Sequence, residues 1–276
     1  MNILESILFG IIQGFTEIFP ISSSGHLSII GNLFGVNSQS FNFQMLTVFL
    51  HIGTMMSIII VYYPELYEMV NDLSLITGLN RTEERRRHYP SARLLLMLTI
   101  TCLPLFLLIP FIDYIDTLYN SSYFVGAMMI VTGLILFISD KLTIDEKDER
   151  NMTILDAILI GLCQLAAVIP GISRVALDMT ACKAVGLSNE FSLKYAYLLS
   201  IPVIFGMNII HIVQAAAYGF VWSEVPLYLI GMVVSMVTGI LAMRLVRRAA
   251  EAGNYYKFAY YSWVAGVLFI ILTIIF

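Results

Sequence analysis

The stretch QGFTEIFPISSSGHL, residues 13–27, places a carboxylate, three serines and an imidazole inside an otherwise apolar N-terminal region. Pro20 and the polar run 22–25 interrupt that region, which extends over 1–36. Proline removes a helical hydrogen bond, and a run of Ser and Gly favours a turn or a cap. We therefore predict two short helices around a break. A single transmembrane helix that tolerates its Pro and Gly is the alternative.

A second apolar region, 152–186, is interrupted in the same way by Pro170 and Gly171. The segments GIIQGFTEIFPISSS (10–24) and GLCQLAAVIPGISR (161–174) resemble each other, because in both a Gln follows a Gly by three residues and Pro and Ser come later. Broken helices at matching places in two halves of a chain point to a binding site near the middle of the membrane.

The composition is that of a membrane protein. Of the 276 residues, 59% are hydrophobic and only 12% are charged, whereas a soluble domain carries about 25% charged residues. Apolar runs long enough to cross the hydrocarbon core occur near 44–63, 94–112, 121–139, 192–217, 225–246 and 258–276. An all-α polytopic membrane protein is therefore predicted. No CxxC pair occurs, so neither a zinc site nor a disulfide framework is expected.

The basic residues predict the orientation. Lys and Arg gather in the connections 64–93 and 140–151 and at or between the last two spans, whereas 113–120 and 218–224 contain none. The positive-inside rule places the basic loops in the cytoplasm. These loops alternate correctly only if each interrupted region enters and leaves on the same side, the first from outside and the second from inside.

This topology predicts one membrane domain built as an inverted repeat. Repeat 1 covers about 1–139, a cytoplasmic loop covers 140–151, and repeat 2 covers about 152–276. Each half is a re-entrant helical hairpin plus three transmembrane helices. Because three is odd, the two halves have opposite orientations in the membrane.

One basic residue, Arg174, is predicted to lie deep in the membrane, with Glu17 and His26 of the other hairpin as its counterparts. A charge at the bilayer centre costs about 2.5–3.5 kcal/mol on insertion scales, so it needs a partner or a wet cavity. Gln13 and Glu17 are four residues apart and share a helix face. Ser22, Ser23, Ser24 and Gly25 can cap the next helix and, with its free amides, bind an anion.

These groups suggest phosphate chemistry or phosphate transport. Glu17 can act as a base or hold a metal with Gln13, and a serine or His26 can attack phosphorus or activate water. Arg174 binds phosphate bidentately and would stabilise charge on the phosphoryl oxygens. Two purely structural interpretations stay open. The Glu17–Arg174 pair could serve only to join the two halves, and His26 could be simply a buried, hydrogen-bonded histidine.

The other histidines and the basic run have simpler interpretations. We expect His51 and His211 to be packed, hydrogen-bonded residues within spans, with His51 also able to line a cavity. The run RTEERRRHYPSAR (81–93), including His88, is expected to be a solvated loop that touches anionic lipid headgroups. Nucleic-acid binding is not expected.

At these residues the sequence resembles the undecaprenyl pyrophosphate phosphatase family, also called the bacitracin-resistance family, over most of the chain. QGFTE matches the acidic motif, and FPISSSGHL is close to the family's Pro–x–Ser–Ser–Ser/Thr–Gly–His. PGISRVALD resembles the second motif, Pro–Gly–x–Ser–Arg–Ser–x–x–Thr, and GLSNEFSLKYAYLLSIP (186–202) resembles the segment that follows it.

The resemblance implies a hydrolase of the bacterial inner membrane. It would remove one phosphate from undecaprenyl pyrophosphate at the outer face, which recycles the carrier lipid for peptidoglycan synthesis. The family fold, an inverted repeat with two re-entrant hairpins, agrees with the topology above. A divalent cation, Mg²⁺ or Ca²⁺, is the implied cofactor; a polyprenyl pyrophosphate and membrane lipids are the implied partners, and a homodimer is an open alternative.

The resemblance also assigns roles to residues. Glu17 and Gln13 match the acidic, cation-linked motif, Ser23 and His26 match the nucleophile and base region, and Arg174 matches the pyrophosphate-binding motif. The predicted catalytic residues are thus Glu17, Ser23, His26 and Arg174. The predicted substrate-binding residues are Gln13, Ser22, Ser24, Gly25, Gly171, Ser173 and Asp178.

Four departures from the family pattern keep a second hypothesis open. Val175 replaces a Ser, Ala176 a Gly and Asp178 a Thr, and His51 stands where Gln is common. An Asp beside a pyrophosphate repels it by about 4 kcal/mol at an effective dielectric near 20, unless a metal or Arg174 compensates. The alternative to a phosphatase is therefore a transporter that moves a polyprenyl phosphate between leaflets without hydrolysis.

Overall fold

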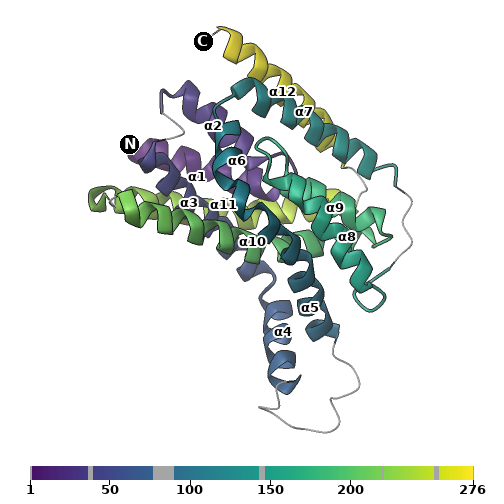
Figure 1. Cartoon of the computed structure of the whole chain (residues 1–276). Helices are drawn as coiled ribbons and strands as arrows, with labels where there is room; N and C mark the ends of the chain where they lie inside the picture. The colour runs from purple at the N-terminus through teal and green to yellow at the C-terminus, as the bar shows by residue number, and fades with distance from the viewer. Residues whose placement is uncertain are drawn as a thin grey trace.

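The computed structural model describes residues 2–36, 40–76, 90–142, 147–218, 221–251 and 255–275. This part of the chain is helical, and its one β-bridge joins Lys147 to Leu187. Figure 1 shows the helices packed around one another, with the chain ends on the same side of the view. The predicted all-α class is confirmed. The basic run 81–93, with His88, lies largely outside the described residues.

The first interrupted region forms two helices, as predicted. Helix α1 (Ile3–Ile18) begins at Asn2, whose side chain accepts a hydrogen bond from the Glu5 amide in a capping box. Helix α2 (Ser23–Leu33) begins after Ser22, whose side chain caps it. Ser22 has φ of +71° and is the one non-glycine residue with positive φ in the described ranges. The break is therefore a sharp, strained turn between the two helices.

The second interrupted region is built in the same order. Helix α8 (Ile154–Gln164) continues into a 3₁₀ turn, η3 (Leu165–Val168), and helix α9 (Arg174–Ala184) begins after its cap, Ser173. Gly171 lies in the break with φ of +94°, and a Cβ atom there would come within 2.4 Å of the Val125 carbonyl oxygen. Only glycine fits this position, because both its dihedral angle and its surroundings exclude a side chain.

Six helical segments in the described ranges are long and apolar enough to cross a membrane. They agree with the predicted spans to within a few residues and comprise α3 (Phe41–Val61), α5 (Pro90–Cys102) with η2 (Leu103–Phe111), α7 (Ser122–Ser139), α10 (Asn189–Tyr218), η4 (Trp222–Glu224) with α11 (Val225–Glu251), and α12 (Tyr256–Ile275). Two shorter helices, α4 (Tyr63–Ile76) and α6 (Ile112–Leu118), complete the fold. The chain is a multi-pass membrane protein.

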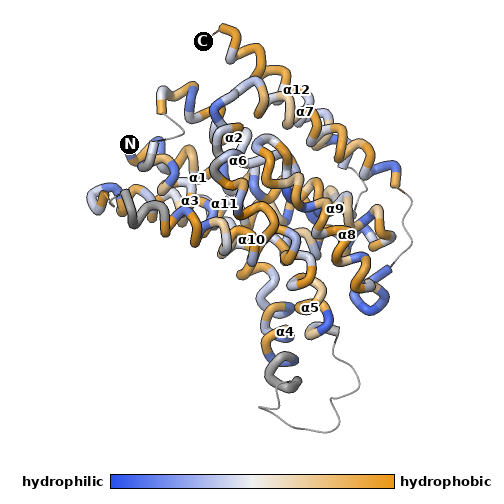
Figure 2. The backbone as a smooth tube through the Cα atoms, in the orientation of Figure 1, coloured by the Kyte–Doolittle hydropathy of each residue, from blue (hydrophilic) through white to orange (hydrophobic). Residues whose placement is uncertain are grey.

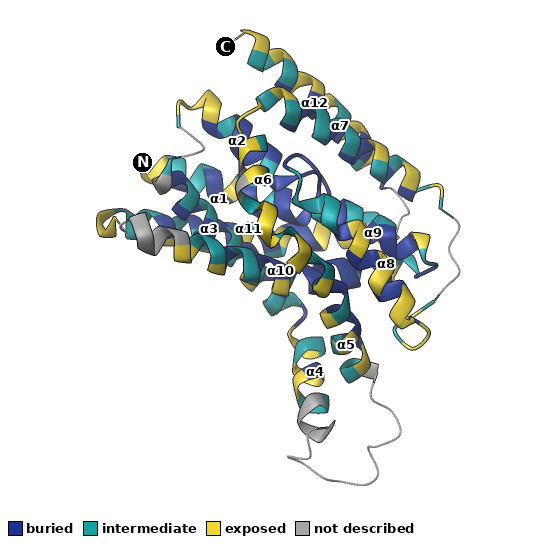
Figure 3. Ribbon diagram, viewed as in Figure 1, coloured by how far each residue is buried: buried dark blue, intermediate teal, exposed yellow. Residues whose placement is uncertain are grey.

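Hydrophobic residues occur along the outer helices of the bundle as well as through its centre (Figure 2). Val264 of α12 is 68% exposed and Phe205 of α10 is 58% exposed. Figure 3 shows exposed residues along the outer faces of α8, α10 and α12, and buried residues where the helices meet. In a water-soluble protein such surfaces would aggregate, whereas lipid tails solvate them.

The helix pairings bring the two hairpins into the centre. Helix α1 packs on α11 and α3, α8 packs on α5, α9 packs on α7 and α10, and α7 packs on α12. Gly10 and Gly14 of α1 allow a close approach to α11, because a Cβ atom at either would lie 2.7 Å from a carbonyl oxygen of that helix, Gly231 or Ser235. The inverted relation of the two halves stays a prediction, as do the boundaries of the repeats.

Candidate active site

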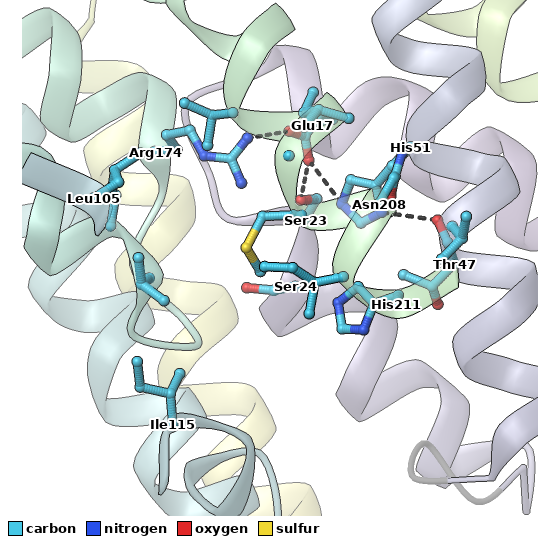
Figure 4. A pocket seen from close by; sticks show the side chains of 18 of the residues that line it. Glu17, Ser23, Ser24, Thr47, His51, Leu105, Ile115, Arg174, Asn208 and His211 are labelled. Atoms are coloured by element: carbon cyan, nitrogen blue, oxygen red, sulfur yellow. Dashed lines mark hydrogen bonds and ion pairs between the residues drawn. The ribbon is translucent and has the colours of Figure 1, made fainter. Parts of the chain in front are cut away.

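A cavity of about 570 Å³ lies where the breaks of the two hairpins meet α3, η2 and α10 (Figure 4). Glu17, Ser23 and Arg174 line it, and so do His51 and Ser173. Two hairpins far apart in sequence thus supply the carboxylate and the guanidinium to one site, as the sequence predicts.

Glu17 is the centre of a buried polar cluster. Its side chain accepts hydrogen bonds from Ser23 Oγ and from Gln13 Nε2, the latter at 3.2 Å. The other carboxylate oxygen, Oε1, lies 3.6 Å from Arg174 Nη1, and Oε2 lies 3.6 Å from His51 Nε2. Glu17 is only 7% exposed, so these partners replace the water that an ionised carboxylate would otherwise need.

The strained turn at Ser22 explains how Ser23 reaches Glu17. Because Ser22 has positive φ and caps α2, the first residue of that helix faces back towards the end of α1. Ser24 in the same turn accepts a hydrogen bond from the Gly171 amide at 3.4 Å. That bond joins the break of the first hairpin to the break of the second.

Thr132 of α7 fixes the second break. Its hydroxyl donates to the Gly171 carbonyl oxygen at 2.8 Å and accepts from the Ser173 amide at 3.0 Å. Ser173 in turn caps α9, because its Oγ accepts from the Ala176 amide at 3.3 Å. Arg174, the first residue of α9, is therefore held at a helix N-terminus, where both the backbone and its own charge favour an anion.

Comparison with known proteins identifies the relatives of this chain. A family model described as "Bacitracin resistance protein BacA" matches residues 6–268. The chain belongs to the BacA family.

Named relatives of this BacA-family protein match it from end to end. The undecaprenyl-diphosphatase of Alkaliphilus metalliredigens is 30% identical over 277 residues, which is 100% of both chains. That of Halothermothrix orenii is 32% identical over 280 residues, again 100% of both. That of Methanococcus maripaludis strain C7 is 32% identical over 270 residues, covering 98% of this chain and 99% of the relative.

The acidic motif of this BacA-family protein offers oxygen donors to a cation. Gln13 Oε1 is buried and has no hydrogen-bond partner, and it belongs to the side chain that contacts Glu17. Carboxylate and amide oxygens suit Mg²⁺ or Ca²⁺, and Mg²⁺ usually takes its remaining ligands from phosphates and water. Within the described ranges no group of three or more His, Cys, Asp or Glu could hold a metal. Glu17 lines the cavity and Gln13 does not, so Glu17 is the oxygen donor that fits a cation shared with a phosphate, and Gln13 contacts Glu17 from behind.

The structure does not bring His26 into the cavity. Its Nδ1 donates to the Ser22 carbonyl oxygen at 2.7 Å, and its Nε2 accepts from the Tyr261 hydroxyl at 2.9 Å. The ring also stacks on Tyr261, with 5.7 Å between the ring centroids. Because both nitrogens are occupied, the expectation of His26 as a base at the phosphate is not supported, and the hydrogen-bonded alternative describes it better. Gly25 likewise does not line the cavity, since it packs against Met129.

We expect His26 to act by holding the Ser22 turn. His26→Leu should lower phosphate release roughly 10- to 100-fold and lower the melting temperature, because the Ser22 carbonyl loses its buried donor. Tyr261→Phe keeps that bond and should cost less than about tenfold in rate. Rates and thermal unfolding of both purified variants check this. A thousandfold loss of rate in His26→Leu at an unchanged melting temperature would show direct catalysis instead.

The prediction that Asp178 binds substrate is also not supported by the structure. It is fully buried, neither carboxyl oxygen has a hydrogen-bond partner, and it does not line the cavity. It lies one helical turn beyond Arg174, on the part of α9 that packs inside the bundle. The expected repulsion between Asp178 and a pyrophosphate therefore loses its geometric basis, whereas Val175, the other substituted position, does line the cavity.

Asp178→Asn should consequently change KM and kcat by less than about threefold, because the isosteric amide alters no residue on the cavity wall. Steady-state kinetics on the lipid substrate measure this. A tenfold or greater fall in KM would instead show that the carboxylate opposes the phosphate through Arg174.

Sequence reasoning missed several cavity residues. Both His51 and His211 line the cavity. The sequence predicts packed, hydrogen-bonded residues at both positions, and a place on the cavity wall only as a second option for His51. Thr47, whose carbonyl accepts from His51 Nδ1 at 2.8 Å, and Asn208 were not singled out. A polar residue within an otherwise apolar span was the one signal that could have found them.

Proposed function

We propose that this BacA-family protein hydrolyses undecaprenyl pyrophosphate to undecaprenyl phosphate and inorganic phosphate. The observation that carries this proposal is the hydrogen bond from Ser23 Oγ to Glu17, whose other oxygen lies 3.6 Å from Arg174 Nη1. A nucleophile, its base and a cation for the phosphoryl oxygens thus form one cluster. The relatives are named undecaprenyl-diphosphatase, which is the same reaction.

The cavity suits an amphiphile with a charged head. Its polar end holds the Glu17 cluster, and Figure 4 shows Leu105 and Ile115 on the wall opposite His51. Further apolar residues extend this lining: Phe106, Leu108, Ile109, Ile112, Val203 and Ile204. An isoprenoid chain would contact these side chains while the pyrophosphate contacts the polar end.

In the first step, the oxygen of Ser23 attacks the terminal phosphorus and its proton passes to the Glu17 carboxylate. The bond between that phosphorus and the bridging oxygen breaks, and its electron pair leaves on the lipid phosphate. Arg174 neutralises charge that spreads over the phosphoryl oxygens in the transition state.

In the second step, water attacks the phosphoserine. Glu17, restored to its carboxylate by proton transfer to the departing lipid phosphate, takes a proton from that water. The phosphorus–Oγ bond breaks, Ser23 regains its hydroxyl proton, and inorganic phosphate leaves. One residue thus serves as base in both halves of the reaction.

A divalent cation, Mg²⁺ or Ca²⁺, is part of the proposal. Glu17 would hold it at the cavity wall, with Gln13 contacting Glu17 from behind, and the ion would supply charge neutralisation to the phosphate oxygens. The membrane setting is proposed as well: a bacterial plasma membrane, with the basic loops in the cytoplasm and the site open to the outer face.

Transport without hydrolysis is less well supported. A transporter needs donors for the phosphate but no serine aligned with a buried carboxylate, and the relatives are named for hydrolysis. Phosphatase activity therefore accounts for more of the site than transport does.

The test is phosphate release from undecaprenyl pyrophosphate by purified protein in liposomes, with and without Mg²⁺ or Ca²⁺. The double variant Glu17→Ala/Arg174→Ala is the blank. We expect cation-dependent release that is absent from the blank. Equal phosphate release by the wild-type protein and the blank would disprove the proposal. Movement of labelled lipid phosphate between leaflets without phosphate release would favour the transporter.

A further inference from the structure

Helix α10 carries two polar side chains into the cavity from within an apolar span. Asn208 and His211 both line the cavity and, being three residues apart, share one face of the helix. Asn208 is only 6% exposed, and its Nδ2 has no hydrogen-bond partner. A buried amide donor without an acceptor is costly, so a bound group is the natural partner for it.

This pair lies next to the catalytic cluster and is distinct from it. His51, which lines the same cavity, lies 3.6 Å from Glu17 Oε2 through its Nε2. Figure 4 shows His51, Asn208 and His211 on the same side of the cavity. The side chains of Leu105 and Ile115 face this side from across the cavity. The polar surface therefore extends from Glu17 along α10, opposite an apolar wall.

A pyrophosphate substrate needs a polar surface that extends beyond the Glu17 cluster. If Ser23 attacks the terminal phosphorus, Arg174 and the helix N-termini surround the terminal phosphate. The lipid-linked phosphate must then lie one phosphate further along the cavity, between the catalytic cluster and the apolar walls. Leaving its oxygens without donors there would cost binding energy.

We infer that Asn208 and His211 form a second anion subsite, which binds the lipid-linked phosphate of the substrate and retains it as the product's phosphate. This assignment rests on the proposed function. Asn208 donates through Nδ2 and His211 through a ring N–H. The subsite distinguishes a lipid pyrophosphate, which fills both anion positions, from inorganic phosphate, which needs only the terminal one.

The experiment compares two inhibitors of phosphate release. Farnesyl phosphate, a short lipid monophosphate, probes the second subsite, and inorganic phosphate probes the terminal one. In Asn208→Leu and His211→Leu we expect the inhibition constant of farnesyl phosphate to rise roughly 10- to 100-fold each. The inhibition constant of inorganic phosphate should stay within about threefold of wild type.

Ile212→Leu, on the lipid-exposed side of the same helix, is the matched control and should change neither constant. Thermal unfolding of each variant shows whether it is folded. If a leucine variant fails to fold, Asn208→Asp provides the second test, because its added negative charge should repel farnesyl phosphate at least as strongly.

The outcomes separate this inference from the proposed function. Equal weakening of both inhibitors would place the residues in the terminal site, and no change in either would make them packing residues; both results overturn the inference. If wild-type protein releases no phosphate, the proposed function fails, and equilibrium binding of labelled farnesyl phosphate replaces inhibition. A selective loss of that binding in the α10 variants still supports the subsite, and unaltered binding overturns it.

Discussion

Glu17→Gln should lower phosphate release by at least about a thousandfold. The amide keeps the shape of the side chain but cannot take the Ser23 proton, and general base catalysis alone contributes 10²–10⁴-fold. The exchange also leaves Arg174 Nη1 without its anion at 3.6 Å. Single-turnover phosphate release, measured beside farnesyl phosphate binding, separates the loss of chemistry from any loss of affinity.

Glu5→Gln is the control on the same helix. Glu5 is partly exposed and closes the capping box of α1, a position that Gln also fills. It should leave the rate unchanged. A Glu17→Gln rate within tenfold of wild type would exclude Glu17 as the base and would leave the Glu17–Arg174 pair as a structural link between the hairpins.

Arg174→Ala should lower kcat/KM by about 10³-fold or more, as expected for an arginine that stabilises phosphoryl transfer. Arg174→Lys should recover only part of that loss, because an ammonium group lacks the planar, bidentate fork of a guanidinium. Inorganic phosphate should also inhibit Arg174→Ala more weakly than wild type, which a competition assay measures.

Arg244→Ala, on an exposed position of α11, controls for the general loss of an arginine and should have no effect. The variant Glu17→Gln/Arg174→Ala should be scarcely slower than either single variant, because residues that act as one unit are not additive. If the two effects multiplied fully, Glu17 and Arg174 would be acting independently.

Much of the fold follows from local sequence patterns. Pro20 and Pro170 break apolar regions that are otherwise helical, and the serines that follow them cap the next helices, as Ser22 and Ser173 do. The six spans follow from the length of the apolar runs. Such features depend on neighbours within one or two helical turns, so a single chain reveals them.

The candidate site was only partly predictable. Two charged residues deep in the membrane, Glu17 and Arg174, each require a partner, so their proximity could be anticipated from the free-energy cost of an unpaired charge there. Which of the histidines faces the cavity could not be anticipated. His26 sits in the motif but faces Tyr261, whereas His51 and His211, in unremarkable spans, face the cavity. Helix rotation decides this, and rotation is set by packing against helices distant in sequence.

By itself, the sequence determined where the helices break, which segments are apolar enough to span, and that an acid and a guanidinium lie within them. Tertiary structure alone decided that Thr132 holds the second break, that Asp178 lies away from the cavity, and that α10 adds Asn208. The physical reason is the distance along the chain over which each kind of interaction acts. Caps, breaks and hydropathy act along the chain, whereas the direction of a side chain within a bundle depends on the helices that close around it.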